Sequence, residues 1–341
     1  MVDFPPAANN LLLTSSQGRM TMVLLQILWN DILPLFAFIA CGWFLDSKFK
    51  IDVDTYSKLT VYVILPGFIF FSLYKYQPSP QDLAMIPAAL LLMLLMYLIA
   101  MLSARKFGKE DAFDFCAVST FSNSGHLGAA LAMMIFSHAP FLVDGKPAYL
   151  TEAMGIMSIL MVCMNVAVNT IGAAMVRHNH DKAAHMVGIL CRTPALYAAL
   201  LAFLVRFLDI KLEGTFMYPV LYHFDGAFLV LITITIGLQL HRTHHFIPNA
   251  FVLGSSFLKL IVSPILAYAI LIGFGHFSPV ASQVFLIYAA IPSSITLVIY
   301  GIEYQKQPGL LVQAVIFNTL AGILTVPTVI YLCRIVFPFS I

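Results

Sequence analysis

Charged side chains are scarce in this sequence, and their scarcity excludes a soluble globular protein. Asp, Glu, Lys and Arg together make up 10% of the 341 residues, and hydrophobic residues make up 60%. Soluble domains carry about 25% charged residues. Because a water-soluble fold has too little interior to bury so much apolar surface, most of the chain must contact lipid.

The signatures of metal centres, disulfide frameworks and common enzymes are also missing. HExxH, GxSxG and Walker sequences do not occur, and no long basic run is suited to nucleic-acid phosphates. No CxxC pair occurs, so we expect the cysteines to be small packing residues at Cys41, Cys116, Cys163, Cys191 and Cys333. The sequence predicts no enzyme, no cofactor or metal and no nucleic-acid partner.

Ten apolar stretches are long enough to cross a bilayer, which takes roughly 20 residues each. They lie at about 22–45, 56–76, 83–104, 112–137, 151–176, 189–209, 216–240, 249–274, 279–302 and 309–336. Short polar turns connect them, and the first stretch is too long for the core of a signal peptide. The sequence therefore predicts one all-α polytopic membrane domain over residues 1–341, surrounded by the lipid bilayer.

Lys and Arg in the connecting turns predict the orientation, because cytoplasmic turns are rich in these residues. One face of the membrane would hold Arg19, Lys75, Lys146, Arg206, Lys211 and Arg334. The richer face would hold Lys48, Lys50, Lys58, Arg105, Lys106, Lys109, Arg177, Lys182, Arg192, Arg242 and Lys306. We expect the richer face in the cytoplasm and both termini on the opposite side of the cell (inner) membrane.

Two halves of five spans, residues 22–176 and 189–336, would have opposite orientations because five is an odd number. The fourth span contains STFSNSGHLGAA (119–130), and the ninth contains AAIPSSIT (289–296), which are polar interruptions at corresponding positions. Paired interruptions of this kind mark transporter binding sites near the bilayer midplane. We expect two inverted five-helix repeats whose fourth and ninth helices are broken and cross.

The fourth span offers Asn123, Ser124, Gly125 and His126 as substrate-binding candidates. Gly permits backbone conformations closed to other residues, and Ser and Asn offer the backbone alternative hydrogen bonds. A break in lipid frees N–H and C=O groups that protein or a water-filled cavity must satisfy. The N-terminus of the following half-helix then attracts an anion. The alternative is a tight helix crossing, in which small residues only permit close packing.

The ninth span adds Pro292, Ser293 and Ser294 to the substrate-binding candidates. Proline removes an N–H group and breaks or kinks a helix. In the fourth span, His126 has a side chain that can change charge near neutral pH, which suits proton coupling or an acidic substrate. The alternative is a neutral imidazole that hydrogen-bonds a carbonyl within the crossing.

Three asparagines and a lysine lie inside other spans. Asn165 and Asn169 are one turn apart in the fifth span, and Asn318, a further substrate-binding candidate, lies in the tenth. All three are candidates for lining the cavity beside the breaks or for coupling, although we favour hydrogen bonds that only join helices. Lys259 lies in the eighth span, and we expect its stem to reach the cytoplasmic surface. The alternative for Lys259 is a buried counter-ion for an anion, with a role in the cavity or in coupling.

Charged residues near span ends point less clearly to a role. For Glu152 and Glu303 we expect solvated or helix-end roles rather than ion coordination. The cluster after the seventh span contains His241, Arg242, His244 and His245. Cations are favoured at helix C-termini, and metal binding by two imidazoles is the alternative. The role of this cluster stays open.

Several stretches together resemble the auxin efflux carrier family. LTVYVILPGFIFFSL (59–73) is similar to its second span, and SNSGHLGAAL (122–131) is similar to its fourth-span break. IGLQL (236–240) and FLKLIVSPIL (257–266) are similar to parts of its seventh and eighth spans. AAIPSSITLVIYGIEY (289–304) and TLAGILTVPTVIYL (319–332) are similar to its last two. The similarity follows the order and spacing of the family over nearly all ten spans.

This resemblance implies a fold related to bile-acid symporters and sodium/proton antiporters. It implies a scaffold of spans 1, 2, 6 and 7, which pairs two copies into a homodimer, and a moving transport domain of spans 3–5 and 8–10. It implies that Asn123, the backbone around Gly125, Pro292 and Ser293 hold a small carboxylate. The chain departs from the family at Ala130, where a proline is usual, and at His126, where an aromatic residue is usual. The short turn after the fifth span is similar to the bacterial malonate and malate carriers.

Three functions are consistent with the sequence. The main hypothesis is a secondary carrier of small organic anions, chiefly carboxylates, that works by elevator-type alternating access. The membrane potential, worth about 2.3 kcal/mol per charge per 100 mV, or an H⁺ or Na⁺ gradient would drive it. The alternatives are an H⁺ or Na⁺ exchanger, which lacks the expected intramembrane acidic pair, and a non-transporting membrane sensor of the same fold.

Overall fold

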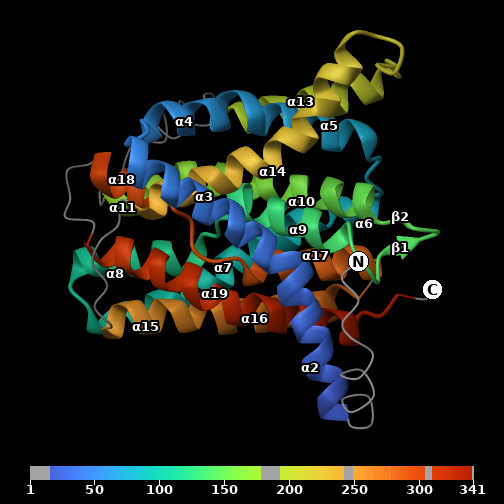
Figure 1. Ribbon diagram of the computed structural model, residues 1–341. Coiled ribbons are helices and arrows are strands. Elements are labelled where there is room, and N and C mark those ends of the chain that lie inside the picture. Colours follow the sequence, from blue (N-terminus) through green and yellow to red (C-terminus); the bar gives the residue numbers. More distant parts are fainter. Residues whose placement is uncertain (1–15, 178–192, 242–248, 276, 304–308, 340–341) are drawn as a thin grey trace.

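Helices account for nearly all of the computed structural model, which describes residues 16–339 apart from 178–192, 242–248, 276 and 304–308 (Figure 1). Seven helices of this part are long and apolar enough to cross a bilayer: Met22–Phe49, Thr55–Lys75, Pro80–Lys106, Leu150–Arg177, Met217–His241, Ala250–Phe274 and Gly309–Val336. Shorter apolar helices lie at the predicted fourth, sixth and ninth spans: Ser124–Phe136, Pro194–Phe207 and Pro279–Ala290. The predicted all-α polytopic membrane fold is confirmed.

The individual elements include short π- and 3₁₀-helical turns, which are labelled η. The first half contains α2 (Ser16–Ile27), η1 (Leu28–Ile32), α3 (Leu33–Phe49), α4 (Val53–Leu59), η2 (Thr60–Ile64), α5 (Leu65–Lys75), α6 (Pro80–Leu83), α7 (Met85–Ser103), η3 (Ala104–Lys106), α8 (Lys109–Thr120), η4 (Ser124–Gly128), α9 (Ala129–Phe136), β1 (Leu142–Val143), β2 (Lys146–Pro147), α10 (Leu150–Ala167), η5 (Val168–Gly172) and α11 (Ala173–Arg177). The second half contains α13 (Pro194–Phe207), α14 (Met217–His241), α15 (Ala250–Phe257), η6 (Leu258–Val262), α16 (Ser263–Phe274), α17 (Pro279–Ala290), α18 (Thr296–Glu303) and α19 (Gly309–Val336).

A two-stranded hairpin follows α9. Strands β1 and β2 pair antiparallel, and Asp144 and Gly145 between them both have positive φ angles. An Asp-Gly pair favours this tight turn, because glycine and aspartate tolerate the left-handed region. The hairpin is a small addition to the helical fold expected from the sequence.

Prolines explain three of the π-helical turns. The turns η1, η2 and η6 end two residues before Pro34, Pro66 and Pro264. Proline has no N–H group to give to the carbonyl four residues earlier, so the regular bonding pattern fails there. A π-turn lets the bonding pattern shift by one residue while the helix continues through the bilayer.

Helix contacts divide much of the molecule into two groups. In the first group, α3 packs against α14, and α5 packs against α13 and α14. In the second group, α7 contacts α8 and α16, while α17 contacts α10, α16 and α19. In Figure 1 the helices α5 and α13 lie at the top of the view, and α15 and α16 lie at the bottom. Helix α10 joins the groups, because it also contacts α5.

Two glycines allow α3 and α14 to meet backbone against backbone. A Cβ atom at Gly237 would overlap the carbonyl oxygen of Ile39, and one at Gly42 would overlap the carbonyl oxygen of Ile234. Close approach of this kind is typical of small residues at membrane helix crossings. No side-chain motion can relieve an overlap with backbone, so both positions require glycine.

We therefore expect Gly237→Ala to destabilise the protein, by about 1–3 kcal/mol or more because the added methyl overpacks the crossing. Gly226 lies in the same helix, and a Cβ atom there would meet nothing within 4 Å. Gly226→Ala is thus a matched control, expected to stabilise by about 0.5–1 kcal/mol through reduced backbone entropy. Thermal unfolding in detergent measures both, and equal shifts for the two variants would contradict the crossing.

A buried ion pair connects the first span to the last. Asp31 in η1 is 2% exposed, and its Oδ2 atom lies 3.4 Å from Nη2 of Arg334 in α19. Its Oδ1 atom lies 3.4 Å from Nδ1 of His138, which follows α9. The Arg334 guanidinium also lies 5.3 Å from the centre of the Phe141 ring. These contacts fasten η1 to the ends of α9 and α19.

Candidate functional site

The fourth and ninth spans are both interrupted, as the sequence predicts for 119–130 and 289–296. Helix α8 gives way to an extended Phe121, and helical bonding resumes in η4. Helix α17 ends before an extended Ile291. The residue before a proline is disfavoured in the helical conformation, which explains the end of α17. Both predicted interruptions are confirmed.

The two interruptions meet and pair as an isolated antiparallel β-bridge. The backbone N–H of Asn123 donates to the carbonyl of Pro292 at 2.8 Å. The N–H of Ser294 donates to the carbonyl of Phe121 at 2.9 Å. Because lipid offers no hydrogen bonds, this exchange satisfies backbone groups that the helix breaks release. The pairing holds the two half-helix junctions at one point inside the protein.

Several polar side-chain atoms of the segments that meet at this crossing are buried without a hydrogen-bond partner in the described part of the chain. They include Oδ1 of Asn123, Oγ of Ser124, Nδ2 of Asn165 and Oδ1 of Asn318. Each such group costs about 1–3 kcal/mol when it is left unsatisfied. These atoms include both donors and acceptors, so a small polar ligand can form hydrogen bonds with them.

Lys259 points into the crossing, and the expectation that its stem reaches the cytoplasmic surface is wrong. The side chain is 1% exposed, and its Nζ atom donates to Oγ of Ser122 at 2.6 Å. Lys259 lies in η6, about halfway along its span, where packing against the fourth span directs the ammonium inward. The alternative of a buried cation beside the break agrees with this geometry.

Ser293 and Asn318 form a hydrogen-bonded chain that supports the break. The Ser293 hydroxyl donates to the carbonyl of Val118 at 2.5 Å and accepts from Nδ2 of Asn318 at 2.6 Å. The ring of Pro292 faces Gly322 in α19, where a Cβ atom would come within 2.9 Å of it. The hydroxyl of Ser293 therefore already donates one hydrogen bond and accepts another, whereas Oδ1 of Asn318 has no hydrogen-bond partner among the described residues.

The two asparagines of the fifth span have different surroundings. Asn165 faces the break, since a Cβ atom at Gly125 would lie 3.2 Å from its Nδ2 atom. Asn169 accepts a hydrogen bond of 2.6 Å from the hydroxyl of Tyr300 in α18. Asn165 thus faces the crossing, whereas Asn169 makes the kind of helix-joining hydrogen bond that we favoured for these asparagines.

The remaining candidates have varied positions. His126 is buried in η4 beside the break. Glu152 accepts a hydrogen bond of 2.8 Å from Ser278 at the start of α17, which fits the expected helix-end role. The side chain of Glu303 lies outside the described residues. Arg242, His244 and His245 also lie outside the described residues. The remaining member of that cluster, His241, has its Nδ1 atom 2.8 Å from Oδ2 of Asp46.

Sequence reasoning missed the partners that determine these contacts. Ser122 was predicted to help interrupt the helix, but its contact with Lys259 joins segments 137 positions apart. Tyr300 carries no signal that distinguishes it from other span tyrosines. Residues so far apart in the chain meet only through helix packing, which periodicity does not encode.

Comparison with known proteins gives one family. The family described as "Membrane transport protein" matches residues 27–187 and 185–330, which together cover most of the chain. No curated protein gives a significant match. This is a family of transporters rather than of enzymes. The chain therefore belongs to the membrane transport protein family, the auxin efflux carriers, and is a multi-pass membrane transporter.

Proposed function

We propose that this transporter carries small organic anions, carboxylates above all, across the cell (inner) membrane. The observation that supports this most is the composition of the crossing. It combines the buried ammonium of Lys259 with unsatisfied polar groups on Ser124 and Asn165. The helix formed by η4 and α9 begins at the break, and the positive end of its dipole adds to the attraction for an anion.

An anion suits this site better than a sodium ion does. The segments that meet there, 118–130, 258–263, 289–298 and 314–322, contain no Asp or Glu. Hard cations such as Na⁺ prefer oxygen ligands and are repelled by a nearby ammonium. The H⁺ or Na⁺ exchanger is thus the weaker candidate, although coupling of anion movement to either ion is compatible with the proposal.

The helix contacts support ten spans arranged as two inverted repeats, over about 22–176 and 189–336. If spans 1–5 correspond to spans 6–10, a contact between spans 1 and 7 should be matched by one between spans 6 and 2. The first is α3 with α14, and the second is α13 with α5. Likewise, the contact of span 3 with span 4 (α7 with α8) is matched by that of span 8 with span 9 (α16 with α17). The contact of span 5 with span 9 (α10 with α17) is matched by that of span 10 with span 4 (α19 with α8).

On the basis of this arrangement we propose elevator-type movement. Spans 1, 2, 6 and 7 form the scaffold, and spans 3–5 and 8–10 carry the crossing past it. We also propose a homodimer formed through the scaffold, with both termini on the non-cytoplasmic side. The short turn between the two halves favours a carrier of the malonate and malate type within the family.

Uptake of radiolabelled carboxylates into proteoliposomes tests this function. We expect uptake of at least one small carboxylate, and a KM about tenfold or more higher in Asn123→Ala, because one hydrogen bond to a charged group is lost. Asn169→Ala is the matched control, since Asn169 bonds Tyr300 away from the break. Uptake by Asn123→Ala equal to that of the unmodified protein would remove Asn123 from the site.

A further inference from the structure

The first span divides its contacts between the two helix groups. Its N-terminal part, α2, packs against α19 of the second group, and η1 packs against both α9 and α19. Its C-terminal part, α3, packs against α14 of the first group. In Figure 1 the blue chain accordingly runs from α2 at the bottom of the view up to α3 beside α14. The two ends of this span are therefore attached to different groups.

The attachment of η1 combines a buried charge with apolar packing. The Asp31 carboxylate lies 3.4 Å from nitrogen atoms of both Arg334 in α19 and His138 after α9. Ile27 and Ile32, on either side of Asp31 in the chain, are 1% and 3% exposed. Separating a buried carboxylate from its cation is strongly unfavourable. Movement of α19 away from η1 would therefore be opposed, whereas movement of the two together would keep every contact.

The attachment of α3 to α14 is backbone against backbone. Gly42 of α3 and Gly237 of α14 make this approach possible, since a Cβ atom at either position would overlap a carbonyl oxygen of the other helix. Surfaces packed this closely are not continuously deformable. Helix α3 is thus fixed to the scaffold helix α14, while η1 is fixed to α9 and α19.

The segment between these two attachments lacks regular helical bonding. Pro34 has no N–H group to give to the carbonyl of Asn30, and the π-turn η1 ends two residues before this proline. Prolines and π-turns are the positions at which long helices kink. Hinge movements are absorbed by a few residues at the ends of elements. Residues 28–34 therefore have the properties of a hinge between α2 and α3.

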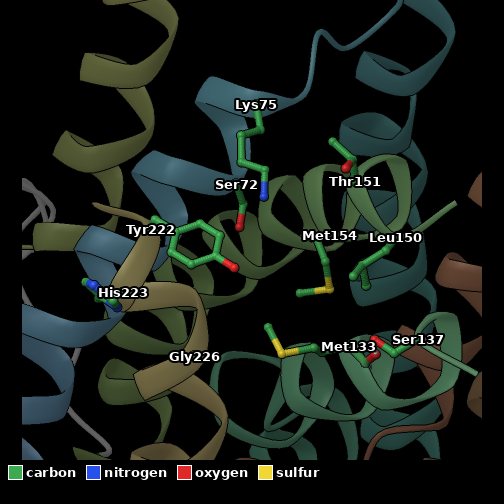
Figure 2. A pocket seen from close by; sticks show the side chains of 10 residues that line it. All are labelled: Ser72, Lys75, Met133, Ser137, Leu150, Thr151, Met154, Tyr222, His223 and Gly226. Atoms are coloured by element: carbon green, nitrogen blue, oxygen red, sulfur yellow. Dashed lines mark hydrogen bonds between the residues drawn. The ribbon is translucent and has the colours of Figure 1, made fainter. Parts of the chain in front are cut away.

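Elsewhere the two groups are partly separated by a cavity of about 340 Å³ (Figure 2). Tyr222 and Gly226 of α14 lie on one side of it, and Met133 of α9 and Met154 of α10 lie on the other. Methionine side chains are flexible and adapt to changed surroundings. A shift of α9 and α10 along α14 is therefore easier at this cavity than a separation of α19 from Asp31.

We propose that α2 and η1 form a strap that travels with the transport domain, while α3 stays with the scaffold and residues 28–34 bend between them. The contact between Asp31 and Arg334 then stays intact throughout the transport cycle. The role of the strap in transport rests on the proposed elevator-type movement. The hinge itself is a property of the protein that can be measured without a substrate.

Distances between spin labels test the hinge in the full-length protein in proteoliposomes, with the native cysteines replaced by alanine. The labelled positions are exposed residues of α2, α3 and α19: Leu25, Phe44 and Leu332, each replaced by cysteine in pairs. We expect a narrow distance distribution between positions 25 and 332, because α2 and α19 move together. The distribution between positions 25 and 44 should be about twofold broader or more, because this pair spans the hinge.

A pair within the scaffold is the matched control for these widths. Phe44→Cys with Gly226→Cys joins α3 to α14, and a Cβ atom at Gly226 would meet nothing within 4 Å. This distribution should be as narrow as that between positions 25 and 332. Equal widths for the pairs 25–332 and 25–44 would overturn the strap.

A covalent link tests whether η1 moves with the transport domain. Asp31→Cys with Arg334→Cys, joined by a short bis-methanethiosulfonate, replaces the ion pair and leaves no buried charge. We expect carboxylate uptake by the linked protein to stay within about twofold of the unlinked protein, because the linked segments move together. The matched control links Gly226→Cys to Met133→Cys across the cavity of Figure 2. This link joins scaffold to transport domain and should lower uptake about tenfold or more.

Loss of uptake on linking positions 31 and 334 would overturn the strap, because η1 would then belong to the static scaffold. If that variant fails to fold by size-exclusion chromatography, Asp31→Cys with His138→Cys and Arg334→Met links η1 to the end of α9 instead. Absence of carboxylate uptake in the unlinked proteins would reject the carrier function, and the widths of the spin-label distributions would still decide the strap.

Discussion

Replacing Lys259 with methionine should make the protein more stable and almost stop carboxylate transport. The ammonium is buried, and among the described residues its hydrogen-bond partner is the neutral hydroxyl of Ser122. Burial of a charge without an opposite charge is costly. An apolar side chain of similar volume removes that cost. Replacing even a buried ion pair in this way is neutral or stabilising by about 1–4 kcal/mol, so we expect a gain of at least this order for a charge that lacks an opposite charge. Stability given up at a binding site in this way is a recurrent sign of function.

Transport should respond in the opposite direction. Without the cation, the substrate carboxylate loses its charged partner inside a low-dielectric site, and we expect kcat/KM for uptake to fall about 100-fold, equivalent to roughly 2.7 kcal/mol. Thermal unfolding in detergent and proteoliposome uptake measure the two effects. Ser122→Ala is the matched comparison, because it removes the hydroxyl and leaves the charge, so it should lower stability. A Lys259→Met protein that transports normally would show that the ammonium has no part in anion binding.

Arg334→Met should destabilise the protein by about 3–5 kcal/mol, because it leaves the buried carboxylate of Asp31 with only the half-exposed His138 as a partner. Asp31 is 2% exposed, and Arg334 is 14% exposed. The guanidinium is also lost from the face of the Phe141 ring. Thermal unfolding in detergent should show a correspondingly large fall in Tm.

The double variant Asp31→Asn with Arg334→Met should recover most of this loss, because no unpaired charge is left buried. His138→Ala should have a much smaller effect, since His138 is 41% exposed and water screens its contact with Asp31. If the double variant is as unstable as Arg334→Met alone, the loss comes from packing around Phe141 rather than from the buried charge.

Local chemistry was enough to predict the apolar spans and the two places where helices break. Runs of apolar residues define the membrane segments, because every backbone group in lipid must be satisfied within a helix. Pro292 and the Ser-Asn-Ser stretch at 122–124 mark the two interruptions, because they disfavour regular helical bonding. These properties depend on residues within a few positions of one another, so a sequence by itself determines them.

The direction of each polar side chain was decided only by the tertiary structure. Lys259 sits at a depth from which its stem can reach either the surface or the interior, and the position of Ser122 across the packed helices decides between them. Asn165 and Asn169 are similar in sequence context but meet different partners. Such contacts depend on how helices rotate and pack against one another, which hydropathy does not determine.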